Sequence, residues 1–124
     1  DYNGPAGDRG VSGTTDVSSY EGISGIVHRQ NGMFLVGVFL TDAPPAKSAP
    51  PRLDFTKREQ FDLLAPRTGQ TFLVGDGKGH KYKVPQEATR LFLGFADAYL
   101  YQGVPGWYDN NDGYLNVSVD VASE

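Results

Sequence analysis

The 124-residue sequence contains no cysteine. This absence excludes a disulfide framework, a zinc–thiolate site and a thiol nucleophile, but it does not assign the chain to a compartment. Long hydrophobic runs are missing too. None approaches the roughly 20 apolar residues that a membrane helix needs, so we expect no membrane insertion. The chain does not open on a charged segment followed by an apolar one, so we expect a signal peptide to be absent or already removed.

Positive charge is scarce as well. Eleven Lys and Arg residues face fifteen Asp and Glu residues, which gives a formal net charge of -4 and an isoelectric point of about 5.0. Binding to nucleic acid depends on clustered Lys and Arg that neutralise phosphates. The composition therefore disfavours a nucleic-acid partner, and it suits a cation site only weakly.

Turn-forming residues are abundant. The chain has 16 glycines and 8 prolines, and 39% of its residues are hydrophobic. This balance favours short strands joined by many turns over a helical bundle. We expect a single domain over residues 1–124, because single domains usually have about 100–150 residues. The predicted fold is all-β, an antiparallel β-sandwich or jelly roll with one short helix near residues 56–65.

Two dipeptides predict β-hairpins, because Asn-Gly and Asp-Gly between apolar runs are the strongest short-range hairpin signals. The predicted hairpins are 23–28 with 33–40 around Asn31-Gly32, and 71–75 with 81–84 around Asp76-Gly77. Residues 33–40 are apolar on both faces, which indicates a central strand buried between layers. Gly37 inside that run suggests a bulge or a close backbone approach.

Residues 89–95 and 114–121 complete six or seven expected strands. The last of these alternates apolar and polar residues strictly, which is typical of a half-buried strand. The helix prediction rests on a capping box, in which Thr56 and Glu59 would satisfy free N–H groups at a helix start. Pro66 would end that helix.

A polar loop between two expected strands is the candidate functional site. Residues 97–113 include Asp97, Asp109, Asn110, Asn111 and Asp112. Calcium binds six to eight hard oxygen ligands at about 2.3–2.6 Å, and this loop offers such oxygens. A plain polar connection with Asx-turns explains the same residue types. The spacing does not match an EF-hand.

The segment Val104-Pro-Gly-Trp-Tyr-Asp-Asn-Asn-Asp-Gly-Tyr-Leu-Asn-Val-Ser-Val119 resembles the C-terminal motif of the bacterial calcium-dependent, galactose-binding lectins of the PA-IL type. That motif reads Asn-Asp-Val-Pro-Gly-x-Tyr-x-Asn-Asn-x-Gly-Ser-Phe-x-Val-x-Val. Upstream, Gly4-Pro-Ala-Gly-Asp8 is similar to the family's Gly-Pro-x-Gly-Asp segment. The resemblance implies a small jelly-roll sandwich in which a calcium ion binds two sugar hydroxyls directly. It also implies a bacterial protein that is secreted, periplasmic or at the cell surface.

The resemblance also implies roles for individual residues. Asn110 and Asn111 match the family's paired asparagine ligands of calcium. Trp107 would offer its carbonyl to the ion, and Val104 would offer its carbonyl to the sugar. The family's aspartate ligand is matched by Asp97 if an insertion follows the preceding strand.

The chain departs from the family pattern in three places. A gapless alignment puts Gly103 on the aspartate, and Asp109 is then the reserve carboxylate ligand. The family's sugar-contacting histidine and glutamine fall near Val11 and Thr14, so galactose specificity does not carry over and the glycan stays unspecified. The family places strands before its Gly-Asp segment, so we expect either that an N-terminal portion is missing or that the topology differs.

Aromatic residues complete the sugar-site prediction. Trp107 is the only tryptophan of the chain, and Trp107 or Tyr108 would stack on the apolar face of a sugar ring, which Asp97 and Asn110 would orient. No Gly-x-Ser-x-Gly elbow occurs, and His28 and His80 read as surface histidines at strand ends. We therefore expect a non-enzymatic, calcium-dependent carbohydrate-binding domain. A calcium-stabilised structural or protein-interaction sandwich is the alternative, a glycosidase or esterase is a third reading, and a homo-oligomer stays open.

Overall fold

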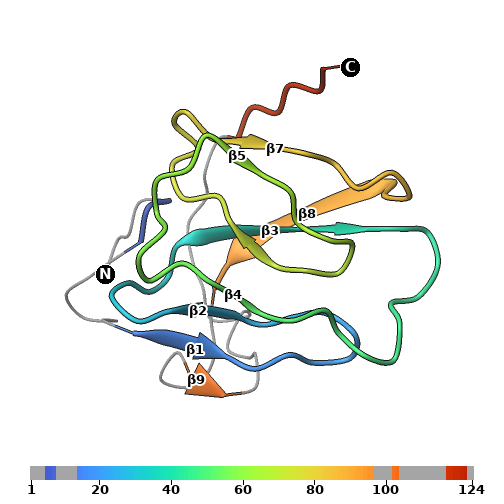
Figure 1. Cartoon of the computed structure of the whole chain (residues 1–124), viewed down its shortest axis with the longest axis horizontal. Coiled ribbons are helices and arrows are strands. Elements are labelled where there is room, and N and C mark those ends of the chain that lie inside the picture. The colour runs from blue at the N-terminus through green and yellow to red at the C-terminus, as the bar shows by residue number, and fades with distance from the viewer. Residues whose placement is uncertain (1–4, 8–13, 97–101, 104–116, 123–124) are drawn as a thin grey trace.

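The computed structural model describes residues 5–7, 14–96, 102–103 and 117–122 (Figure 1). Within these residues the fold is all-β, because nine strands and no helix are present. The strands are β1 (Thr15–Val17), β2 (Ile26–His28), β3 (Leu35–Leu40), β4 (Leu53–Asp54), β5 (Leu63–Leu64), β6 (Phe72–Leu73), β7 (Lys81–Tyr82), β8 (Arg90–Phe95) and β9 (Gln102–Gly103).

These strands form three sheets. The strand orders are β4-β2-β1-β9, β6-β3-β8 and β5-β7. The β1–β2, β3–β6 and β3–β8 pairs are antiparallel, whereas β1–β9, β2–β4 and β5–β7 are parallel. Most partners are far apart in the sequence, so long connections rather than tight hairpins join the strands (Figure 1).

One hydrophobic core joins the sheets. Val17 and Ile26 contribute from the four-stranded sheet, and Phe39 and Phe72 contribute from the three-stranded sheet. The rings of Phe39 and Phe72 stack with their centroids 5.2 Å apart. Each fully buried residue of this size removes enough apolar surface from water to stabilise the fold by roughly 1.5–3 kcal/mol.

The predicted central strand is confirmed. β3 lies between β6 and β8, and alternate residues along it are buried. The close backbone approach expected at Gly37 is also present, since a Cβ atom there would lie 2.7 Å from Phe72 Cζ. Gly37 is therefore the position at which the Phe72 ring packs directly on the backbone of β3.

Both hairpin predictions are wrong. β2 belongs to the four-stranded sheet and β3 to the three-stranded sheet, so Asn31-Gly32 joins two sheets rather than two paired strands. A turn does form at Asp76-Gly77, where the Gly77 N–H donates to the Val74 carbonyl at 3.0 Å. β6, which precedes this turn, nevertheless pairs with β3, and β7, which follows it, pairs with β5.

The short helix predicted near residues 56–65 is also wrong. The segment forms turns, bends and the strand β5. Thr56 does not cap a helix, because its hydroxyl donates to Asp54 Oδ1 and accepts the Arg29 N–H at 2.9 Å. Glu59 contacts His28 instead of a helix start. The capping-box residues thus bond to other strands.

The two last predicted strands differ in outcome. Residues 89–95 are confirmed as β8. Over the described part of the predicted strand 114–121, residues 117–121, no strand is formed and every residue is exposed. The alternating valines Val117, Val119 and Val121 are 47%, 56% and 83% exposed. Periodicity marks a segment able to form a strand, but a strand also needs a partner.

The contact between Gly37 and Phe72 predicts a stability difference between two glycines in neighbouring strands. Gly37→Ala should lower the free energy of unfolding by about 1–3 kcal/mol, because the new methyl group overlaps the Phe72 ring. Gly94→Ala is the control, since no heavy atom lies within 4 Å of its added Cβ. Urea unfolding of both variants measures the difference, and equal stabilities would contradict this account.

Candidate functional site

The residues predicted to bind calcium and sugar lie outside the described residues. They are Asp97, Val104, Trp107, Tyr108, Asp109, Asn110 and Asn111. The described residues beside them do show how the chain approaches this segment.

Two strands of different sheets, β8 and β9, flank residues 97–101. Ala96, which directly precedes Asp97, is 2% exposed, and its N–H donates to the Phe34 carbonyl at 3.0 Å. Gln102 and Gly103, which directly precede Val104, form β9 and pair with Asp16 and Val17 of β1. The chain is therefore fixed to the three-stranded sheet before Asp97 and to the four-stranded sheet before Val104.

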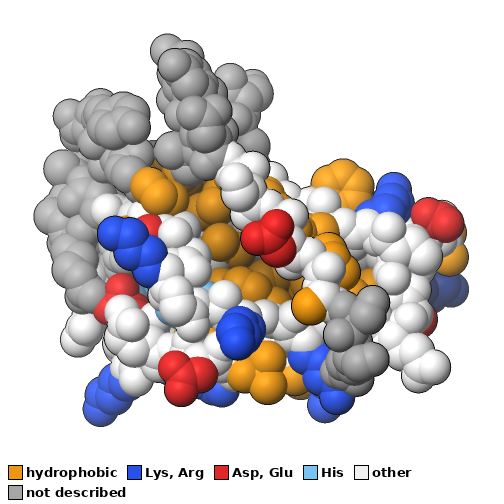
Figure 2. Space-filling model, turned by 90° about the horizontal axis from the view of Figure 1, so that it is seen from above, with side chains coloured by type: hydrophobic (Ala, Val, Ile, Leu, Met, Phe, Trp, Pro, Cys, Tyr) orange, Lys and Arg blue, Asp and Glu red, His pale blue; other side chains and the backbone are white. Residues whose placement is uncertain are grey.

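An apolar groove lies beside these two anchor points. Its volume is about 360 Å³, and its lining includes Val17 of β1, Val36 and Val38 of β3, Phe92 of β8 and Ala96. Val17 and Ala96 thus connect the groove to both anchors. Seen from above, hydrophobic side chains also gather in a hollow in the middle of the molecule (Figure 2). A concave apolar surface of this volume suits a small apolar group.

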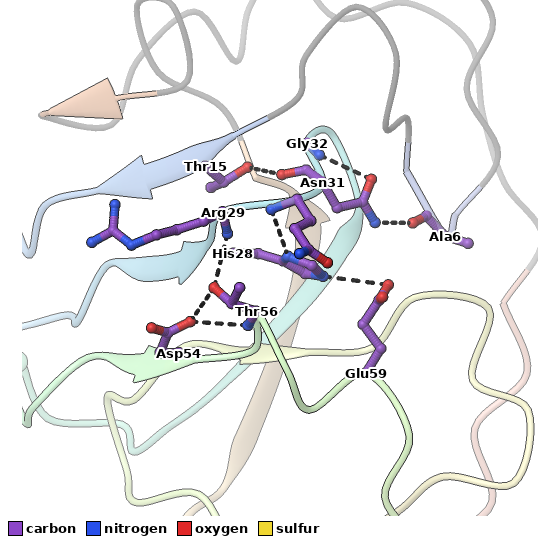
Figure 3. Close-up of polar contacts among 10 residues, drawn as sticks. Ala6, Thr15, His28, Arg29, Asn31, Gly32, Asp54, Thr56 and Glu59 are labelled. Atoms are coloured by element: carbon purple, nitrogen blue, oxygen red, sulfur yellow. Dashed lines mark hydrogen bonds and ion pairs between the residues drawn. The ribbon is translucent and has the colours of Figure 1, made fainter.

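A buried histidine marks the end of β2 (Figure 3). His28 is 0% exposed, and its Nδ1 accepts the Gln30 N–H at 3.3 Å. Its Nε2 lies 3.3 Å from Glu59 Oε2. Because Nδ1 acts as an acceptor, the neutral ring carries its proton on Nε2, which faces the carboxylate. The expectation of a surface histidine is therefore wrong for His28, although its place at a strand end is right.

Asn31 makes a second set of buried hydrogen bonds beside His28 (Figure 3). The Asn31 side chain donates to the Ala6 carbonyl at 2.6 Å and accepts the Gly32 N–H at 2.9 Å. The Asn31 carbonyl accepts the Thr15 hydroxyl at 2.7 Å. Asn31 therefore joins the N-terminal segment, β1 and the connection between β2 and β3.

Asp54 fixes the turn after β4. Its Oδ1 accepts both the hydroxyl and the N–H of Thr56. These two hydrogen bonds hold the pKa of the Asp54 carboxyl below its ordinary value, and the positive charge of Arg29 acts in the same direction. The turn therefore favours the ionised carboxylate.

A second histidine belongs to an aromatic cluster. His80 stacks on Phe61 with ring centroids 4.1 Å apart, and Tyr82 meets Phe61 edge-on at 5.8 Å. The Tyr82 hydroxyl donates to the Leu73 carbonyl at 2.9 Å. Burial raises the pKa of Tyr82, and the negative charge of Asp76 raises it further. The contacts of His80 and Tyr82 are those of packed side chains that join β6 and β7.

The described residues offer no cluster of three or more His, Asp or Glu side chains that could bind a metal ion. Nor does this part of the chain contain a helix with the length and hydrophobicity to cross a membrane. Comparison of the chain with protein-family models, with curated proteins and with solved structures found no match.

Sequence reasoning missed the buried polar cluster around His28 and Asn31. The signal for His28 was its place directly after the apolar residues Ile26 and Val27. Both of these are buried, and the His28 ring is buried with them. Asn31 was read only as a hairpin residue. Glu59 was read only as a capping residue, although its carboxylate contacts His28.

Two adjacent threonines allow a test of the buried cluster. Thr15→Val should lower the free energy of unfolding by about 1–3 kcal/mol, because the buried Asn31 carbonyl loses its hydroxyl partner. Thr14→Val is the control, since Thr14 is only half-buried and its bond to the Arg29 carbonyl can be replaced by water. Thermal and urea unfolding would contradict the role of Thr15 if both variants lost the same stability.

The turn at Asp54 predicts a pH-dependent stability. Because its pKa is lower in the folded state, Asp54 stabilises the fold above its ordinary value of 3.8 and loses this effect as the pH falls through the folded-state pKa. Asp54→Ala should cost at most about 1 kcal/mol at pH 7, because Asp54 is exposed and solvent screens its charge, and the difference should shrink as the pH falls below 3.8. Asp62→Ala, at a second exposed aspartate, is the control. A pH-independent difference between wild type and Asp54→Ala would contradict this assignment.

Proposed function

We propose that this chain is a calcium-dependent carbohydrate-binding domain and that it is not an enzyme. The observation that carries the proposal is the motif from Val104 to Val119, which follows directly on a strand fixed to the four-stranded sheet. The fixed strand before Val104 supports a ligand segment, because a binding site requires its ligands to be positioned by rigid elements. The proposal includes a secreted, periplasmic or cell-surface bacterial protein.

The donor chemistry of the motif fits calcium. Asp97 supplies a carboxylate, Asn110 and Asn111 supply amide oxygens and Trp107 supplies a carbonyl, with Asp109 as the reserve ligand. All of these are hard oxygens, which calcium prefers. When bound, calcium would supply two coordination positions to neighbouring hydroxyls of the sugar.

Residues of the chain would position the sugar. The Val104 carbonyl would accept a hydrogen bond from a sugar hydroxyl, and Asp97 and Asn110 would orient the hydroxyls. The ring of Trp107 or Tyr108 would cover the apolar face of the sugar, since aromatic faces suit the C–H groups of a pyranose. The ligand class is a glycan, galactose-like or other.

The finer fold assignment belongs to the same proposal. An antiparallel β-sandwich or jelly roll is supported by two sheets that share one core, to which Val17 and Ile26 contribute from one sheet and Phe39 and Phe72 from the other. The β1–β2, β3–β6 and β3–β8 pairs are antiparallel as this fold requires, whereas β4 and β9 depart from it by pairing in parallel. In such a fold the loops at one end of the sandwich are available for ligands. The segment after Ala96 follows directly on an end of β8.

Calcium titration tests the metal site. We expect calcium at a hundredfold excess over its dissociation constant to stabilise the fold by about 2.7 kcal/mol, which raises the melting temperature. Asp97→Asn should abolish most of that rise, whereas Asp62→Asn, at an exposed position in another segment, should leave it unchanged. No melting shift with calcium in the wild-type chain would refute the metal site.

Calorimetry on a glycan panel then tests sugar binding. A sugar that binds with calcium and fails to bind after EDTA supports direct coordination. Binding that survives EDTA would refute the mechanism. A calcium-dependent melting shift without a response to any glycan would favour the alternative, a calcium-stabilised structural or protein-interaction domain.

A further inference from the structure

β8 is an edge strand with apolar side chains in solvent. Among the described residues it pairs with β3 alone, in the order β6-β3-β8. Its consecutive residues Leu91, Phe92 and Leu93 are 36%, 48% and 39% exposed. An exposed hydrophobic edge strand is a surface on which another strand can pair.

The register shows which backbone groups face the open edge. The Ala96 N–H donates to the Phe34 carbonyl at 3.0 Å, which extends the register in which Leu35 opposes Phe95. Hydrogen-bonded and non-hydrogen-bonded residue pairs alternate along two antiparallel strands. Leu91 and Leu93 therefore direct their N–H and C=O groups away from β3.

A second part of the chain has the complementary pattern. Residues 117–122 form no strand, and the valines at 117, 119 and 121 are exposed, with Ser118 and Asp120 between them. Alternation with a period of two places the valines on one face and the polar residues on the other in an extended segment. Such a segment needs a strand edge with a matching apolar row.

One antiparallel register satisfies the apolar rows and the charges at once. Its opposed pairs are Leu93 with Val117, Leu91 with Val119, and Arg90 with Asp120. Arg90 opposes Asp120 at a non-hydrogen-bonded position, where side chains are closest, so the opposite charges meet. A shift by one residue would place Asp120 on an apolar row.

We propose that residues 117–122 of one copy add to the β8 edge of a second copy as an antiparallel strand, and that the reciprocal contact forms a dimer. In a single copy, both the segment and the β8 edge leave their apolar side chains exposed. In a twofold dimer each copy covers the β8 edge of the other with its own residues 117–122. The same two surfaces of each copy are therefore buried. This contact does not depend on calcium or on sugar.

Cross-linking tests the register directly, because the chain has no cysteine of its own. We expect an equal mixture of Leu91→Cys and Val119→Cys chains to form a disulfide-linked dimer under mild oxidation, since directly opposed residues lie about 5.5 Å apart. The control mixture pairs Leu91→Cys with Val121→Cys, whose diagonal spacing of about 7–8 Å is too long for a disulfide.

Three other results of the cross-linking experiment would overturn the proposal. Equal cross-linking in both mixtures would show random collision rather than a register. A chain carrying both Leu91→Cys and Val119→Cys that closes only an internal disulfide would show that the segment pairs with its own β8. Absence of any cross-link would show that the two surfaces do not meet.

Charge reversal provides an independent measurement in solution. Arg90→Asp and Asp120→Arg should each raise the dissociation constant of the dimer about tenfold, because each change places like charges opposite each other at both contacts. Combining the two changes should restore the wild-type constant. Sedimentation equilibrium measures it, and a combined variant as weak as the single variants would contradict the pairing of Arg90 with Asp120. A wild-type chain that stays monomeric at all concentrations would refute the dimer.

Discussion

The chain crosses from the four-stranded sheet to the three-stranded sheet between β2 and β3, and buried hydrogen bonds at this crossing determine how the two sheets meet. Asn31 is 2% exposed and bonds through its side chain and its carbonyl to two separate segments, at Ala6 and Thr15, and to its neighbour Gly32. A buried polar group without a partner costs about 1–3 kcal/mol. Any arrangement that separated Asn31 from Thr15 and Ala6 would bear that cost. These hydrogen bonds therefore favour the observed packing of the core residues on either side of the crossing.

Much of the fold was accessible to sequence reasoning because it depends on local patterns. The all-β class followed from composition, β3 and β8 followed from apolar runs, and Gly37 suggested a bulge or a close backbone approach, of which the structure shows the approach, made by the Phe72 ring. The hairpins and the helix were predicted wrongly because their signals describe hydrogen bonds that local partners could make. In the fold, the same side chains of Asn31 and Thr56 bond to distant segments instead. A local pattern cannot indicate when a distant partner competes for the same atoms.

The candidate site divides in a similar way. Residue types alone identified the oxygen-rich segment, and the structure adds that Ala96 and Gly103, on either side of residues 97–101, are fixed to different sheets. The apolar groove could not have been predicted, because Val17, Val36 and Phe92 come from three strands whose proximity depends on the topology. The contact between His28 and Glu59 escaped for the same reason, since each residue had a satisfactory local interpretation.

The parallel pairing of β1 with β9 has a consequence for the order in which the molecule folds. Asp16 pairs with Gln102, so the outer edge of β1 stays without this partner until residues 102–103 have left the ribosome. Contacts between residues so distant in sequence form slowly. The chain loses the conformational entropy of the intervening loop before the contact itself contributes to stability. During synthesis β1 therefore has an unpaired edge until residues 102–103 emerge, and such an edge exposes the nascent chain to aggregation.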